Sequence, residues 1–304
     1  MSKSKRSKSK KKTIELSEAK IGFIGAGKMA ECIVQGLISH GKIEPKKIYV
    51  GAPSDKNSSR LKELGVQTTR KMIDIFGKYQ CDIVFLAIHG GAIQKCYADG
   101  GKTPRALFTN YIPGVGKRQQ FVLSLVSGFS LDQIKPCLLH PTETEKYSIQ
   151  FNRIMINAAC AYGVGICAVD VEPDSDKFPS SLRTMLSSIA RVEYVPETQM
   201  DAACALCGAG LAFSYYFIAA LSDGAFKMGL SRQMALKFAA KTVMCAASSL
   251  LETGKHPGEL KDSVCSPKGG AIYGIHVMDK ADCASGITAA VEAAHKRAIE
   301  LAKG

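Results

Sequence analysis

The chain has 304 residues, of which 46% are hydrophobic and 22% charged, and its formal net charge is +13. This composition is ordinary for a globular protein of about two domains, and it excludes a disordered or collagen-like chain. No stretch reaches the roughly 18 uninterrupted apolar residues that a membrane-spanning helix needs, so we expect no membrane partner.

The positive charge is concentrated at the start of the chain, where residues 1–12 read MSKSKRSKSKKK and hold seven basic residues and no acid. Subtracting these seven from +13 leaves +6 for the remainder. Residues 1–12 have no apolar residue after Met1 and cannot fold on their own, and we expect a disordered basic tail over residues 1–19. Nuclear import and weak binding to anionic surfaces are the alternatives. Nucleic acid is not an expected partner.

The same segment lacks the apolar core of a secretory signal and the apolar face of a mitochondrial presequence. We therefore expect a cytoplasmic location rather than a nuclear or mitochondrial one.

Between residue 20 and about residue 195, short apolar runs alternate with amphipathic segments. The runs are Ile21–Ile24, Ile48–Val50, Ile83–Ala87, Phe121–Leu125, Ile154–Ile156 and Ala190–Tyr194. Most are continuous apolar stretches of strand length, which is typical of parallel strands covered on both faces. Helices are predicted between them at Met29–Gly41 and Ser59–Leu64. The alternation predicts a doubly wound α/β domain over residues 20–197.

From about residue 198 alanine becomes frequent, and helices are predicted at Leu211–Met228, Ser231–Thr253 and Ser285–Lys303. Ser231 is a suitable N-cap, and Gly229 and Gly254 stand where helix ends favour a residue that tolerates positive φ. No convincing strand follows residue 200. Residues 198–304 are therefore expected to form an all-helical domain, with the boundary near Glu197.

The eleven cysteines are an odd number, and only Cys204 and Cys207 have CxxC spacing. No second CxxC and no clustered histidines accompany them, and residues 206–210 are expected to form a turn or helix junction. Zinc or redox chemistry at this pair is the minor alternative. Buried thiols in a reduced intracellular compartment are the preferred interpretation, and no metal site is expected.

The strongest local motif is Gly25-Ala26-Gly27-Lys28-Met29-Ala30, a GxGxxA sequence between an apolar run and a predicted helix. Gly25 permits the tight turn, Gly27 lets the backbone approach a pyrophosphate, and Ala30 permits close helix packing. The helix N-terminus offers free N–H groups and partial positive charge to phosphates. The motif therefore predicts a dinucleotide site of the Rossmann type, and we assign residues 25–29 to the cofactor.

Cofactor choice is decided at the end of the second predicted strand, over residues 51–57. A site that prefers NAD usually has Asp or Glu at the tip of this strand, for the ribose hydroxyls. No acid stands at the tip here. The residues that can serve a 2′-phosphate are Ser54, Lys56, Asn57 and Arg60. We predict NADPH, with NADH as the alternative. An ordinary solvated loop and helix start would also explain Lys56 and Arg60.

Four stretches of the chain resemble the pyrroline-5-carboxylate reductase family. They are IGFIGAGKMAECIVQGLISHGKI near the start, the block from Asp201 to Phe213, LSDGAFKMGLSR (221–232) and HPGELKDSVCSPKGGAIYGIHVMD (256–279). Their order and spacing match the family from about residue 20 to residue 303. The resemblance implies an α/β Rossmann domain followed by an all-α dimerisation domain, in a homodimer or a larger ring of dimers. It also implies NAD(P)H-dependent hydride transfer to the C=N carbon of 1-pyrroline-5-carboxylate, which gives L-proline.

The resemblance places the small-molecule substrate on the loop from Ser266 to Ala271. The residues it assigns to the substrate are Ser266, Gly269, Gly270 and Ala271, and it requires neither a metal nor a His/Asp dyad. Such a helix start is also suited to an anion on physical grounds.

Several positions depart from the family pattern. Lys268 replaces the family's first glycine in this loop, and Ala271 stands where the family has a threonine. His89-Gly90 replaces a lysine-proline, and we assign His89 to the cofactor. Of the family's Pro-Asn-x-Pro turn only Asn157 remains, with Ala159 in place of the second proline.

Three functions are therefore compared. The first is an NADPH-dependent reductase of reduced rate, the second a non-catalytic member that binds nucleotide and acts by interaction, and the third a reductase of another cyclic imine. The intact glycine motif favours nucleotide binding, whereas Ala271 and His89 favour the second function. We expect the first, because catalysis in this family consists mostly of positioning.

Overall fold

The computed structural model describes residues 15–54, 57–97, 119–138, 149–172, 175 and 177–303. Most of the predicted basic tail and Lys56 of the predicted cofactor site lie outside these ranges. The chain forms two compact units. The first holds the described residues up to Cys207 together with 298–303, and the second holds residues 208–297. The division after Cys207 falls beyond Glu197, where the sequence pattern changes.

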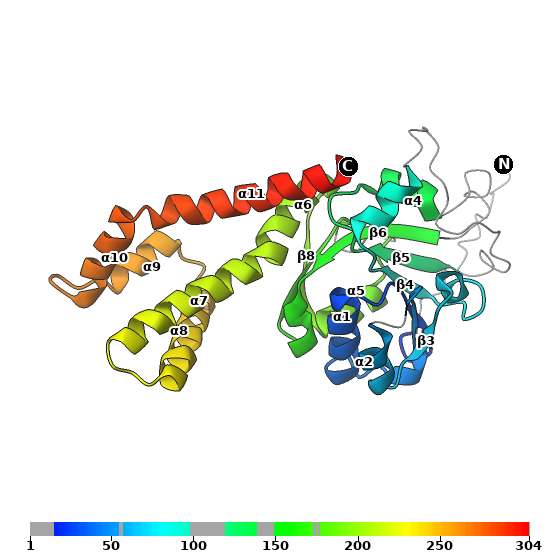
Figure 1. Cartoon of the computed structure of the whole chain (residues 1–304), viewed down its shortest axis with the longest axis horizontal. Helices are drawn as coiled ribbons and strands as arrows, with labels where there is room; N and C mark the ends of the chain where they lie inside the picture. Colours follow the sequence, from blue (N-terminus) through cyan, green and yellow to red (C-terminus); the bar gives the residue numbers. More distant parts are fainter. Residues whose placement is uncertain are drawn as a thin grey trace, which may run out of the picture. The chain divides into compact units, whose positions relative to one another are not determined.

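The first unit is built on a sheet whose described strands run in the order β3-β2-β1-β4-β5-β6-β7-β8 (Figure 1). The strands are β1 (Ile21–Ile24), β2 (Ile48–Gly51), β3 (Gln67–Thr69), β4 (Ile83–Leu86), β5 (Gln120–Ser124), β6 (Ile149–Ile156), β7 (Gly165–Val169) and β8 (Ala190–Tyr194). All neighbouring strands are parallel except β6 and β7. The first unit thus has the predicted Rossmann-like architecture.

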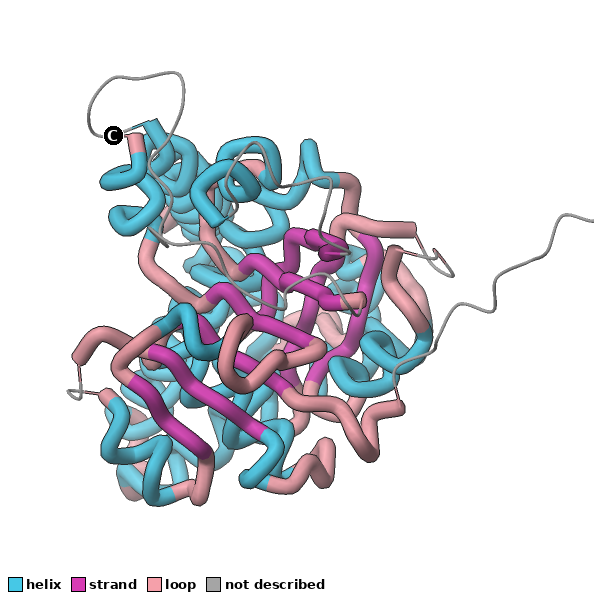
Figure 2. The backbone as a smooth tube through the Cα atoms, turned by 90° about the vertical axis from the view of Figure 1, so that its right-hand side faces the viewer, coloured by secondary structure: helices cyan, strands magenta, loops and turns pink. Residues whose placement is uncertain are grey.

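Helices cover both faces of this sheet. They are α1 (Lys28–Ser39), α2 (Ser58–Glu63), α3 (Gly90–Cys96), α4 (Leu131–Leu138) and α5 (Ser180–Ser187), with 3-10 segments η1 (Pro45–Lys47), η2 (Met72–Ile75), η4 (Ala158–Tyr162) and η5 (Glu197–Gln199). In Figure 2 the strands, in magenta, lie between helices in cyan.

Alternate residues of the central strands enter two separate hydrophobic cores. Phe23 of β1 and Phe85 of β4 stack at 4.8 Å between ring centroids, in the core that includes α1, α2 and α5. Their neighbours Ile24 and Leu86 enter the other core, with η2, α3 and α4. Because successive side chains of a strand point to opposite faces, a strand buried on both faces is apolar throughout. This explains why the continuous apolar runs mark these strands.

Two strands, β3 and β7, were not predicted from the sequence, and β7 runs antiparallel to β6. The connection from β6 to β7 consists of η4 and the residues after it. Among these, Gly163 has a φ of +74°, in the left-handed region. A parallel pair needs a crossover of a dozen or more residues, and this connection is too short for one. The expectation of parallel strands is therefore wrong for this pair.

The chain leaves the sheet through α6 (Met200–Ala203) and a π-helical segment, η6 (Cys204–Ala209), which continues directly into α7 (Gly210–Lys227). Of the turn or helix junction predicted for residues 206–210, the turn is wrong and the junction is present, where the π-helix ends at Ala209 and α7 begins at Gly210. The side-chain amide of Asn157 donates a hydrogen bond of 3.2 Å to the backbone oxygen of Cys207. This bond fixes the π segment against the end of β6.

The second unit consists of α7, α8 (Arg232–Thr253), α9 (Pro257–Ser263), α10 (Gly270–Lys280) and most of α11 (Cys283–Lys303). Ser231 caps α8 as predicted, since its hydroxyl accepts a hydrogen bond of 3.3 Å from the Met234 N–H. Gly229 and Gly254 both have positive φ, which confirms the predicted helix ends. No strand follows Tyr194 in the part of the chain that the structure describes.

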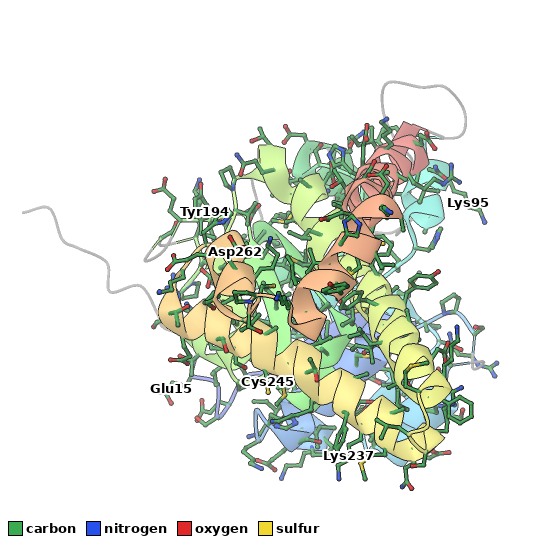
Figure 3. All side chains as sticks on the ribbon, turned by 90° about the vertical axis from the view of Figure 1, so that its left-hand side faces the viewer. Glu15, Lys95, Tyr194, Lys237, Cys245 and Asp262 are labelled. Atoms are coloured by element: carbon green, nitrogen blue, oxygen red, sulfur yellow. The ribbon has the colours of Figure 1, made fainter. Side chains whose placement is uncertain are left out.

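The helices of the second unit bury little of their apolar surface. Within α8 only Ala235 and Ala239 are buried. Figure 3 shows this helix, on which Lys237 and Cys245 are labelled. Large apolar side chains are exposed on several helices, among them Tyr215, Tyr216, Leu236, Phe238, Met244, Leu251, Tyr273, Val277 and Ile287. Many large apolar side chains exposed on the helices of one unit indicate an interaction surface.

Candidate functional site

The turn between β1 and α1 lies where the strand order reverses. β1 pairs with β2 on one side and with β4 on the other, and the loops that follow β1 and β4 leave the sheet toward opposite faces. In open α/β sheets this point forms the crevice that binds ligands. The Gly25 N–H donates to the Gly51 oxygen at 2.8 Å, and the Ala87 N–H donates to the Ile24 oxygen at 2.8 Å. These bonds hold the ends of the three strands together.

Gly25 has a structural role in this turn. Its φ is +106°, and a Cβ on it would lie 2.3 Å from the backbone oxygen of Ala87. Only glycine fits such a position without displacing backbone. Gly25 therefore sets the path of the chain from β1 into α1.

Gly27 has a different environment, because a Cβ on it would meet nothing within 4 Å. It is the N-cap of α1, with a φ of −77° that any residue adopts, and no side chain among the described residues caps the helix. The first N–H groups of α1 therefore face open space, as a helix N-terminus that binds phosphate does. Ala30 is fully buried behind them. This cradle fits the pyrophosphate of a dinucleotide.

Charged side chains flank the cradle. Lys28 Nζ lies 3.5 Å from one carboxylate oxygen of Glu31, and Arg60 Nη1 of α2 lies 3.4 Å from the other. The side chains of Lys28 and Arg60 are 70% and 71% exposed. These ion pairs therefore contribute little stability, and both cations remain accessible to an anion. Glu31 is a residue that the sequence analysis missed, although its i,i+3 spacing from Lys28 was a signal that it would pair.

The other predicted cofactor residues lie near the same edge of the sheet. Ala26 is buried and Met29 packs against the first hydrophobic core. Ser54 is exposed in the loop after β2, and its backbone oxygen accepts a hydrogen bond of 3.4 Å from the Ser58 hydroxyl. The structure thus brings the β1–α1 turn and the β2 loop together, while Lys56 lies outside the described residues.

His89 follows β4 and is the N-cap of α3. Its Nδ1 accepts a hydrogen bond of 3.2 Å from the Gly91 N–H. Since Nδ1 is the acceptor, the neutral ring carries its proton on Nε2. The side chain is exposed at the end of the strand next to β1. His89 therefore presents a single N–H donor at the crevice.

The predicted substrate loop lies in the second unit, before α10. Pro267 and Lys268 are the central residues of a turn in which the Gly269 N–H donates to the Ser266 oxygen at 3.0 Å. Gly269 is the N-cap of α10 without a capping side chain, and the helix begins at Gly270, where the sequence predicts it. A Cβ on Gly270 would meet nothing within 4 Å. The loop thus exposes backbone N–H groups that suit a carboxylate.

A buried ion pair joins the sheet to α6 and was also missed from the sequence. Arg153 of β6, with a side chain only 4% exposed, pairs with Asp201. Burial raises the pKa of the Cys204 thiol to about 11, although the charge of Arg153 lowers it. Burial also raises the pKa of Cys207. Raised pKa values keep both CxxC thiols protonated, which removes the support for redox chemistry at this pair.

No group of three or more His, Cys, Asp or Glu side chains in the described part of the chain has the geometry to hold a metal ion. The CxxC pair therefore has no partners there for zinc.

Two family models match the chain. The pyrroline-5-carboxylate reductase dimerisation model matches residues 197–301, and a model described as NADP oxidoreductase, coenzyme F420-dependent, matches residues 20–106. The first covers the helical region, and the second covers the β1–α1 turn and the loop after β4.

Relatives match along nearly the whole chain. Pyrroline-5-carboxylate reductase 3 of Bos taurus is 34% identical over 284 residues, covering 93% of this chain and 86% of the relative. Pyrroline-5-carboxylate reductase of Methanosarcina acetivorans is 35% identical, covering 95% and 100%. The crystal structure of the Plasmodium falciparum pyrroline carboxylate reductase with NADP bound has a TM-score of 0.73 at 20% identity, covering 95% and 100%.

Proposed function

We propose that this chain, which belongs to the pyrroline-5-carboxylate reductase family, reduces 1-pyrroline-5-carboxylate to L-proline with NADPH, in proline biosynthesis in the cytoplasm. The family is one of NADP-dependent oxidoreductases. The observation that carries the proposal is the open cradle at Gly27, where the backbone leaves room for a pyrophosphate.

The residues of the first unit have the chemistry to hold the cofactor. When bound, NADPH supplies the hydride that adds to the C=N carbon of the protonated imine, so that this CH becomes CH2 and the C=N bond becomes a C–N bond. The first N–H groups of α1, with Lys28, bind the pyrophosphate. Ser54 and Arg60 serve the 2′-phosphate, and Lys56 is proposed to join them. His89 donates a hydrogen bond from its Nε2–H to the nicotinamide end of the cofactor.

The substrate loop performs the remaining tasks of binding and orientation. Backbone N–H groups at Gly270 and Ala271, in the first turn of α10, bind the carboxylate, and Ser266 and Gly269 border the same site. Ala271 offers no hydroxyl to the ring nitrogen. The loss of such a hydrogen bond costs about 1 to 3 kcal/mol, which slows the reaction without abolishing it. We therefore expect a reductase of reduced rate.

The matched dimerisation model supports a homo-oligomer, and we propose a homodimer, or a ring of such dimers, formed through residues 198–304. The exposed apolar side chains of α7, α8 and α10 supply the surface for it. By length and composition alone, Glu197–Lys227 and Arg232–Thr253 are also able to cross a membrane. Sedimentation of the detergent-free protein as a dimer or larger oligomer would support the proposed assembly, and a requirement for detergent would contradict it.

Ala271 favours a second candidate, a family member that binds nucleotide and acts by interaction without turnover. A reductase of another cyclic imine is the third. Two measurements on the purified protein separate them: oxidation of NADPH followed by absorbance with pyrroline-5-carboxylate, and a titration of NADPH binding. Turnover supports the proposed function. Binding without turnover of this imine supports the other two, which a panel of other cyclic imines then separates.

A further inference from the structure

The turn before α10 contains one residue whose backbone conformation conflicts with its side chain. Lys268 has a φ of +63°, in the left-handed region, at the third position of the Ser266–Gly269 turn. A proline at the second position and a positive φ at the third are the features of a type II turn, which favours glycine or asparagine there. A lysine at this position is strained, because at positive φ its Cβ comes too close to the backbone carbonyl oxygen.

The residues on either side of Lys268 are themselves restricted. Pro267 fixes the φ of the second position. A Cβ on Gly269 would lie 2.3 Å from the hydroxyl oxygen of Ser266, so the fourth position is closely packed. Lys268 therefore adopts its left-handed conformation between a fixed proline and a closely packed glycine.

The charge of Lys268 is not compensated by the described residues either. It forms no ion pair among them. Lys268 also comes directly before the N-cap of α10, at the end of the helix where the partial positive charge opposes a cation. The fold thus keeps an exposed, strained and unneutralised lysine in the loop that the proposed function assigns to the substrate.

We propose that Lys268 is a substrate-binding residue, whose ammonium pairs with the carboxylate of the cyclic imino acid. This inference rests on the proposed function for the location of the substrate and adds an ionic contact to it. Residues with backbone strain of this kind cluster at active sites and ligand-binding loops. Because the pair binds the carboxylate equally in the ground state and the transition state, Lys268 acts on KM and leaves kcat nearly unchanged.

Three substitutions separate charge from strain. Lys268→Met keeps the left-handed residue and its length but removes the charge, Lys268→Gly removes both the charge and the strain, and Lys268→Arg keeps both. We expect KM for the imine to rise about tenfold in the Met and Gly variants and to stay near the wild-type value in the Arg variant. Lys268→Gly should nevertheless unfold at a higher temperature than Lys268→Met. Lys280→Met, at the far end of α10, is the matched control and should leave KM unchanged.

Equilibrium binding tests the same inference without turnover. We would titrate cyclopentanecarboxylate and the uncharged cyclopentanecarboxamide into the full-length protein with NADP⁺ and measure heat. The wild type should bind the carboxylate about tenfold more tightly than the amide, and Lys268→Met should lose this preference. A preference that survives in Lys268→Met, or that is absent from the wild type, overturns the proposal. A Lys268-dependent preference in a protein without turnover would instead refute only the proposed reaction.

Discussion

The two glycines of the β1–α1 turn should respond in opposite ways to the same substitution. In Gly27→Ala the new methyl group meets nothing within 4 Å, and the φ of −77° suits alanine. The loss of a favourable N-cap costs about 0.5 to 1 kcal/mol, and the stiffer unfolded chain returns about 0.4 to 1 kcal/mol. The free energy of unfolding should therefore change by less than about 1 kcal/mol.

Binding should change much more than stability in Gly27→Ala, because the methyl group occupies the space assigned to the pyrophosphate. Loss of two hydrogen bonds to a charged group, at about 1.5 kcal/mol each or more, weakens NADPH roughly 100-fold. Gly25→Ala is the control, since its Cβ would lie 2.3 Å from the Ala87 oxygen at a φ of +106°. That variant should lose about 3 kcal/mol of stability or more.

Urea unfolding and a fluorescence titration of NADPH measure the two quantities separately. The reasoning predicts a stable Gly27→Ala that binds poorly and a destabilised Gly25→Ala. Wild-type affinity in a folded Gly27→Ala would refute the assignment of the cradle to the pyrophosphate.

Three further outcomes are expected. Ser54→Glu should weaken NADPH about fivefold more than NADH, because it places a negative charge near the 2′-phosphate; the two dissociation constants measure this. Ala271→Thr should raise kcat/KM for pyrroline-5-carboxylate about tenfold through a restored hydrogen bond, with little change in NADPH affinity. Burial raises the pKa of the Cys81 thiol from 9.0 to about 12. As pH rises from 9 to 12 this thiol therefore ionises in the unfolded chain before it ionises in the folded one, and the free energy of unfolding falls. Urea unfolding across this range should show a shallower decline for Cys81→Ala than for the wild type.

Each of these expectations has a contrary result. Equal weakening of both cofactors would show that Ser54 lies away from the ribose. No gain in rate from a folded Ala271→Thr that binds NADPH would show that the loop is not a substrate site. The exposed Cys245 supplies the control for the alkaline series. If Cys245→Ala flattened the decline as much as Cys81→Ala, burial would not be its cause.

The strands that the sequence predicts are those buried on both faces. β1 and β4 are apolar throughout because Phe23 and Phe85 fill one core while Ile24 and Leu86 fill the other. β3, with the sequence QTT, is short and partly exposed and so carries no such pattern. The direction of β7 depends on the short connection through η4, which no periodicity in the strand itself reports.

The candidate site was predictable where one local segment makes it and less so where distant segments meet. The GxGxxA motif indicates the cradle because Gly25 and Gly27 act within a single turn. The pairing of Arg60 with Glu31 and that of Arg153 with Asp201 join elements far apart in the chain. The conformation of Lys268 had no such local signal, since Ser266, Pro267 and Gly269 at the first, second and fourth positions are the pattern of a type I turn, whose third residue has a negative φ.

Direct measurement of L-proline formation tests the central claim. The purified full-length protein, given pyrroline-5-carboxylate and NADPH, should produce one L-proline for each NADPH oxidised. Tight NADPH binding with no L-proline above the level of an enzyme-free control would contradict the proposed reductase.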